Sequence, residues 1–257
     1  MALTQNTSSR GCARSASDGL SEVCAEGNLS LEDVYATPEG IADVSLRLKE
    51  WRGQGFCTLP FCHTVEAEAL GAHIVSGNAP VGSRAGAPVF ASLEEVLHVR
   101  MPTEPQGRMA RMLAACALLA DRGERVAFTL SGPVSILSCL VDIGTFFRAW
   151  RKDRDLACAA LSHLGEQLTP FAHHMAEAGT AAISYADPPC APAIVGPRCS
   201  REIAEEFTFG FVETLCREIP DEVDILLCPL ALPPGGEGER AGRARVRCLA
   251  ATARVSL

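Results

Sequence analysis

Short apolar segments alternate with helical segments along most of this chain, and each apolar segment ends in a polar or Pro/Gly-rich cluster. Four segments have the composition and length of β-strands: 55–61, 125–130, 181–185 and 223–227. Between them, apolar residues recur at helical spacing. Strands that alternate with helices predict a parallel sheet with crossover connections, because a tight turn cannot join parallel neighbours.

The same spacing and the capping residues set the expected helices and the division of the chain. Helices are expected from Thr37 to about Arg52, over 65–70, shortly after Ser92, and over 108–122, 153–178 and 200–218, with a kink or a break at Pro170. The polar segment 1–36 is expected to be a flexible lead-in. Residues 37–232 would form the folded domain, and the Gly/Arg-rich segment 233–257 a tail.

Polar clusters follow each predicted strand: Cys62-His63, Ser131-Gly132-Pro133, Asp187-Pro188 and Cys228-Pro229. In parallel α/β folds the functional site lies at the carboxyl ends of the strands. The clusters are therefore expected to meet at one edge of the sheet and to form the site.

Each candidate residue also has a structural interpretation. His63 is a general base or a metal ligand, or a histidine that only bonds a neighbouring loop. Glu66 orients His63 or binds substrate, or is a first-turn glutamate favoured by the helix dipole. Asp187 is a carboxylate in the mouth of the site, or a turn residue that bonds the backbone.

Composition excludes some classes of function. The chain has 257 residues, 47% of them hydrophobic, and a formal net charge of −8. This charge argues against a nucleic-acid-binding protein, which needs a basic surface. P-loop, GxGxxG, HExxH and GxSxG motifs are absent, so nucleotide binding and serine hydrolysis gain no support.

The cysteines and the first residues bear on where the protein works. Twelve cysteines are scattered without a CxxC pair, which favours reduced, mostly packed thiols. The first thirty residues lack the apolar stretch of a secretory signal, and no apolar run approaches the ~20 residues of a membrane span. A cytoplasmic protein that does not enter membranes is expected.

Four segments in register carry a resemblance to a known family: TLPFCHTVEAEALGA (58–72), FTLSGPVSILSCL (128–140), AEAGTAAISYADPPCAPAIVGP (176–197) and DILLCPL (224–230). Together the chain resembles the uroporphyrinogen decarboxylase superfamily, and most closely its branch of methylcobamide:coenzyme M methyltransferases. The resemblance implies a TIM-barrel-like (β/α)8 fold with the site in its mouth. Four clear strands cannot close such a barrel, so the fold is expected to be incomplete at the C-terminus.

The resemblance also implies a reaction and its residues. A thiol acceptor would take the methyl group of a methylcobamide that a corrinoid protein presents. His63, Glu66 and Asp187 would be catalytic, Gly132, Pro133 and Tyr185 would contact the substrate, and Cys228 would bind zinc. A bound zinc ion would keep the thiol as a thiolate.

The chain departs from the family at the metal. The family's H-x-C zinc pair falls on Leu226 and Cys228 here, and leucine cannot bind zinc. Two alternatives therefore stay open: porphyrinogen decarboxylation, which needs no metal, and a non-catalytic relative that binds a tetrapyrrole or a corrinoid protein. The chain has no DxHxxG signature of a corrinoid carrier. An exposed sheet edge would also allow a homodimer.

Overall fold

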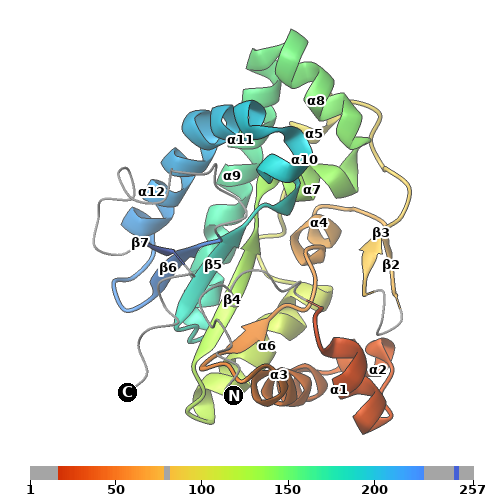
Figure 1. The fold of residues 1–257 in the computed structure, drawn as a ribbon, viewed down its shortest axis with the longest axis vertical. Coiled ribbons are helices and arrows are strands. Elements are labelled where there is room, and N and C mark those ends of the chain that lie inside the picture. The colour runs from red at the N-terminus through yellow and green to blue at the C-terminus, as the bar shows by residue number, and fades with distance from the viewer. Residues whose placement is uncertain (1–16, 78–81, 229–245, 249–257) are drawn as a thin grey trace, which may run out of the picture.

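The computed structural model describes residues 17–77, 82–228 and 246–248. Its main sheet has five parallel strands in the order β1-β4-β5-β6-β7 (Figure 1). The strands are β1 (Cys57–Leu59), β4 (Val126–Ser131), β5 (Ala182–Ala186), β6 (Asp224–Leu227) and β7 (Val246–Cys248). Within this sheet the spatial order of the strands is the same as their order in the sequence, so every crossover connection moves in the same direction across the sheet. Successive right-handed crossovers of this kind place their helices on one face of the sheet, as in a barrel.

The parallel α/β prediction is confirmed, and all four predicted strands are present within a few residues of their expected bounds. One expectation for the tail is wrong. Part of the segment predicted as a tail, Val246–Cys248, forms β7 and pairs with β6. Residues 229–245 and 249–257 lie outside the described residues. A separate antiparallel pair, β2 (Ile74–Val75) and β3 (Arg84–Ala85), lies between β1 and β4 in the sequence.

Helices follow the strands as expected, with additions. The helices that the spacing predicted are α3 (Pro38–Arg52), α4 (Val65–Ala69), α5 (Leu93–Val96), α6 (Gly107–Asp121), α9 (Arg154–Glu177), α11 (Pro197–Ile203) and α12 (Phe209–Glu218). A π-helical turn, η2 (Ala204–Thr208), joins α11 to α12, and α9 runs through Pro170 as one helix. Not predicted were α7 (Pro133–Leu140), α8 (Ile143–Lys152), the 3-10 turn η1 (Pro188–Cys190) and α10 (Pro192–Val195). None of the helices in the described part of the chain is long and apolar enough to cross a membrane.

The second half of the predicted flexible lead-in is ordered, which corrects that expectation. Two short helices, α1 (Leu20–Gly27) and α2 (Leu31–Ala36), contact α3. Apolar residues of both helices, among them Leu20 and Val34, are buried in the main core. Ser30 and Asp33 form a capping box at the start of α2, which fixes its first turn.

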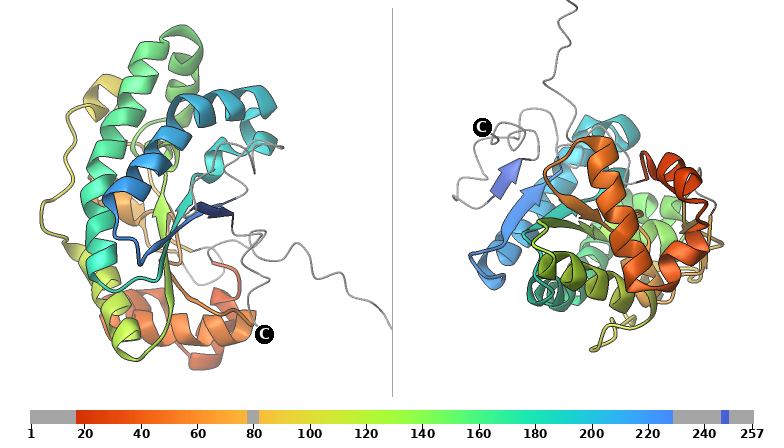
Figure 2. Two further views of the ribbon diagram at one scale, coloured as in Figure 1. Left: turned by 90° about the vertical axis from the view of Figure 1, so that its left-hand side faces the viewer. Right: turned by 90° about the horizontal axis from the view of Figure 1, so that it is seen from below.

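The two faces of the sheet differ in what packs on them. On one face Phe128 of β4 meets Phe171 of α9 edge-to-face, and Tyr185 of β5 meets Phe211 of α12. Both views of Figure 2 place these helices along one side of the sheet. On the other face, which a closed barrel would turn inward, three side chains form a separate small cluster: Ala127, Ala182 and Leu226.

Candidate functional site

Asp187 joins the carboxyl ends of two neighbouring strands. It follows β5, is 1% exposed, and accepts hydrogen bonds at the start of α7, the helix that follows β4. Its Oδ1 accepts from the backbone N–H of Ser135 at 2.7 Å and from the Ser135 hydroxyl at 2.6 Å. Its Oδ2 accepts from the backbone N–H of Val134 at 3.1 Å and from the Tyr185 hydroxyl at 3.3 Å. The carboxylate follows β5, yet it caps α7. It accepts hydrogen bonds from N–H groups in the first turn of that helix, which have no partner within the helix.

The electrostatics of Asp187 follow from this position. Burial raises the pKa of the Asp187 carboxyl, and the donors from Ser135 and Val134 act in the opposite direction. These contacts join Asp187 to the backbone of another helix, which the turn-residue interpretation did not include. The catalytic role that we predicted for it is not tested by them and stays a prediction.

Gly132 allows this close approach. A Cβ atom at position 132 would lie 2.4 Å from Asp187 Cγ and 2.5 Å from the Tyr185 hydroxyl oxygen. Real Cβ contacts are never this short, and both neighbours are held by hydrogen bonds. A glycine is therefore required here for space, and its backbone conformation is one that any residue can adopt.

We expect Gly132→Ala to destabilise the protein by roughly 1–3 kcal/mol, because overpacking forces buried neighbours to move. Urea unfolding followed by circular dichroism measures the change. The matched control is Gly210→Ala in α12, where an added Cβ meets no atom within 4 Å. That control should be stabilised by about 0.5–1 kcal/mol, as for glycine in a helix interior. Equal effects of the two substitutions would contradict the steric account.

Glu66 lies at the carboxyl ends of β1 and β4. It belongs to α4 and is fully buried, and its Oε1 accepts from the backbone N–H of Ser131 at 2.8 Å. Its Oε2 and the Ser131 hydroxyl have no hydrogen-bond partner among the described residues. Burial raises the pKa of the Glu66 carboxyl, with the Ser131 backbone opposing. Glu66 therefore ties the β1–α4 turn to the end of β4.

The raised pKa of Glu66 predicts a pH-dependent stability. A raised folded-state pKa favours the protonated form, so its contribution is complete below the ordinary value of 4.5 and is lost as the pH rises through the folded-state pKa. Glu66→Gln cannot ionise and keeps the acceptor for Ser131. We expect its stability relative to the parent protein to increase from pH 4 to pH 8. Urea unfolding across this range is the measurement. Glu166→Gln, at an exposed position of α9, should show no such trend.

Cys62 is the centre of a buried polar cluster. Arg108, at the start of α6 and 7% exposed, donates to Cys62 Sγ at 3.4 Å and to Thr64 Oγ1 at 2.8 Å. Its Nε donates to Glu68 at 2.6 Å. The Tyr35 hydroxyl lies 3.9 Å from Cys62 Sγ. Sequence reasoning missed Arg108 and Tyr35, because a helix-start arginine and a lone tyrosine far from the strand ends carry no local signal.

His63 lines a pocket at the strand ends, named here the strand-end pocket. Its volume is about 350 Å³. The walls come from the β1–α4 turn (Phe61 to Thr64), from α7 (Ser135, Ser138, Cys139) and from η1 (Pro188, Pro189), with a few residues near β3. His63 Nδ1 is buried and has no hydrogen-bond partner among the described residues. Burial lowers the pKa of His63, so its imidazole is neutral at neutral pH.

The remaining predicted residues are spread over the strand ends. Pro133 and Tyr185 are buried, and neither they nor Gly132 line the strand-end pocket. Cys228 follows β6, and its backbone N–H donates to the Tyr185 carbonyl at 3.0 Å. Its side chain is partly exposed and also lies outside that pocket.

The residues described here do not fit a catalytic zinc site. Leu226 stands at one of the two positions that the family resemblance assigns to a ligand, and its side chain packs with Ala127 and Ala182. Catalytic zinc needs three protein ligands. Within residues 17–77 and 82–228, no three His, Cys, Asp or Glu side chains gather closely enough to hold a metal ion.

Singly wound parallel strands with a polar site at their carboxyl ends define an α/β protein of the TIM-barrel type. The chain belongs to the uroporphyrinogen decarboxylase (URO-D) family, whose profile matches residues 12–229. The family resemblance drawn from the four sequence segments is thereby confirmed.

Two curated relatives and one solved structure agree with this assignment. A "Methylcobamide:CoM methyltransferase MtaA" of Methanosarcina barkeri (strain Fusaro / DSM 804) is 24% identical over 220 residues, which cover 83% of this chain and 65% of that protein. A second Methanosarcina barkeri MtaA is 26% identical over 190 residues, 73% of this chain and 56% of that protein. A "methyltransferase from Methanosarcina mazei" matches the fold with a TM-score of 0.69 at 24% identity, over 82% of this chain and 62% of that one. The chain thus spans less than two thirds of the length of these relatives.

Proposed function

We propose that this protein transfers a methyl group from a methylcobamide to a thiol acceptor, and that the strand-end pocket is the site of transfer. The observation that carries the proposal is the match to two methylcobamide:CoM methyltransferases over 83% and 73% of the chain. The segment that matches the URO-D profile, residues 12–229, contains the β1–α4 turn, α7 and η1, which build the pocket around His63. A small-molecule thiol and a corrinoid protein are the proposed partners.

In this proposal His63 is the catalytic base. A thiol is a poor nucleophile until it loses its proton. His63 lines the strand-end pocket, and its neutral imidazole would accept the thiol proton there. The thiolate sulfur would then form a bond to the methyl carbon. The carbon–cobalt bond breaks with its electron pair left on cobalt, so Co(III) becomes Co(I) and a methyl thioether is released.

Glu66, Asp187, Gly132 and Tyr185 are proposed as positioning residues for this step. Glu66 holds the β1–α4 turn, which carries His63, against the end of β4. Asp187 and Tyr185 hold the start of α7, whose Ser135 and Cys139 line the opposite wall. Pro133 is the first residue of that helix. Zinc has no step in this proposal, because Leu226 offers no ligand atom at its family position.

The test is turnover with defined substrates. Purified protein is mixed with methylcobalamin and coenzyme M, and the loss of the methylcobalamin absorbance is followed under anaerobic conditions. We expect loss of methylcobalamin that depends on both protein and thiol. No loss above the rate without protein would refute the proposal. A parallel assay with uroporphyrinogen III tests the alternative decarboxylation, for which we expect no product.

A second candidate function is a non-catalytic relative that binds a corrinoid protein or a tetrapyrrole. Leu226 favours it, since it removes one of the ligands that the resemblance implies. The two candidates differ in one result. A non-catalytic relative would retain a corrinoid protein on an affinity column, yet leave methylcobalamin unchanged in the turnover assay.

A further inference from the structure

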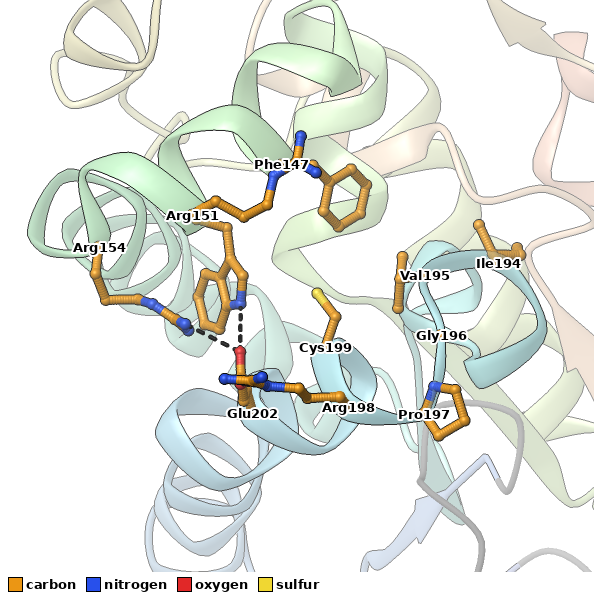
Figure 3. A pocket seen from close by; sticks show the side chains of 11 residues that line it. Phe147, Arg151, Arg154, Ile194, Val195, Gly196, Pro197, Arg198, Cys199 and Glu202 are labelled. Carbon is orange, nitrogen blue, oxygen red and sulfur yellow. Dashed lines mark hydrogen bonds and ion pairs between the residues drawn. The ribbon is translucent and has the colours of Figure 1, made fainter.

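A second, larger cavity shares no lining residue with the strand-end pocket. Its volume is about 780 Å³. One wall comes from α8 and the start of α9, and the other from the segment that runs from α10 into α11 (Figure 3). We name it the arginine pocket. Volumes of this size are typical of sites for small organic ligands.

Much of the wall of the arginine pocket is apolar. Phe147 of α8 lies on one side, and Ile194 and Val195 of α10 lie opposite it (Figure 3). Trp150 of α8 also lines the pocket. Ile194 is 66% exposed, the largest exposed fraction among the large apolar side chains that the structure describes. An apolar ligand body that covers these residues would remove that exposed surface from water.

The charged residues of the pocket are mostly cationic. Three arginines, Arg151, Arg154 and Arg198, share it with a single carboxylate, Glu202. This concentration of positive charge occurs in a chain whose net charge is −8. A pocket with such a balance favours an anion.

Glu202 forms ion pairs with two of the three arginines, Arg154 and Arg198, and Arg154 also pairs with Glu206 at 3.2 Å. Its Oε1 accepts from Arg198 Nε at 2.8 Å, and its Oε2 accepts from Arg154 at 3.0 Å and from the Trp150 indole N–H at 3.4 Å. Arg198 and then Arg154 lower the pKa of Glu202 to about 2, so the carboxylate stays ionised. Arg154 also lies over the Trp150 ring at 3.9 Å, which keeps it in place.

Arg151 is left as the available cation. In the part of the chain that the structure describes, no hydrogen bond or ion pair of its guanidinium is recorded, unlike those of Arg154 and Arg198. Arg151 follows Phe147 by four positions on α8, so both side chains lie on the helix face that lines the pocket (Figure 3). A guanidinium can bind a carboxylate or sulfonate through two parallel hydrogen bonds.

We infer that the arginine pocket binds a small organic anion that has one carboxylate or sulfonate and an apolar body. The anionic group pairs with Arg151, and the body lies between Phe147 and the Ile194–Val195 wall. The inference stands apart from the proposed methyl transfer, because the pocket contains none of the residues assigned to that reaction.

Intrinsic fluorescence gives a direct test. The chain has two tryptophans, and Trp51→Phe leaves Trp150 in the pocket as the only reporter. Titration of this variant with 4-phenylbutyrate should change its fluorescence to saturation, with a dissociation constant below about 1 mM. The neutral analogue 4-phenylbutyramide has nearly the same shape and should bind about ten-fold more weakly or worse.

A pair of variants on one helix assigns the anion contact. In the Trp51→Phe background, Arg151→Gln should weaken 4-phenylbutyrate binding about ten-fold or more. Arg148→Gln removes a charge from an exposed arginine of α8 that does not line the pocket, and should change binding less than two-fold. The inference is overturned if no saturable change occurs, if the amide binds as tightly as the acid, or if the two variants bind equally well.

Discussion

Asp187→Ala is expected to destabilise the protein by about 4 kcal/mol. The substitution removes the acceptor of four donors at once: two backbone N–H groups of α7, the Ser135 hydroxyl and the Tyr185 hydroxyl. Each buried donor left without a partner costs about 1–3 kcal/mol, and part of this cost is recovered when the site relaxes. Domains are stable by only about 5–15 kcal/mol, so the change should be evident in any unfolding curve.

The urea unfolding of this variant is compared with that of a variant that loses an exposed helix N-cap. Asp153 caps α9 at an exposed position, where its Oδ1 accepts from the backbone N–H of Leu156 at 3.3 Å. Asp153→Ala should cost only about 1 kcal/mol, as for exposed N-caps. If Asp187→Ala cost no more than Asp153→Ala, Asp187 would not join the two strand ends in the way described, and its catalytic interpretation would gain weight.

His63→Ala is expected to lower kcat/KM for the proposed methyl transfer about 100-fold at pH 7, since a positioned general base contributes about 10²- to 10⁴-fold. Burial lowers the pKa of His63, so the base stays deprotonated at neutral pH. The rate of the parent protein should therefore fall only below the ordinary imidazole value of 6.5. Without the base, the variant depends on thiolate formed in solution, and its rate should rise about ten-fold per pH unit up to the pKa of the thiol, near ~8.5.

The shape of this pH profile separates catalysis from a structural defect. A folding defect would lower the rate by a similar factor at every pH. His98→Ala, at an exposed position outside the strand-end pocket, is the matched control and should keep the parent rate and profile. A His63→Ala variant with the parent profile would remove His63 from the mechanism.

The sequence predicted four of the strands well, because each of them is a short apolar run followed by a polar or Pro/Gly-rich cluster. It did not predict α1 and α2, since their few apolar residues, such as Leu20 and Val34, lie in a mostly polar segment. Helix α8 was also missed. Only Phe146 and Trp150 of this helix are buried, so its apolar pattern is short. The helix also does not directly follow a strand.

Only those residues of the site that are close in sequence to the end of a strand could be predicted. His63, Glu66 and Asp187 all lie where the alternation placed them, at the carboxyl ends of β1 and β5. What each one contacts depends on tertiary structure. Asp187 caps a helix 52 positions earlier in the chain, and Arg108 reaches Cys62 across 46 positions. Such pairings have no periodic signature in one sequence.

The formation of a methyl thioether in the presence of a metal chelator is the most direct test of the account. The protein is incubated with EDTA, trideuteromethyl-labelled methylcobalamin and coenzyme M, and the thioether is quantified by mass spectrometry. Because the account assigns the thiol proton to His63 and no step to zinc, labelled thioether should form with EDTA present and decrease strongly in His63→Ala. Thioether that appears only after zinc is added back, at equal rates with and without His63, would contradict it.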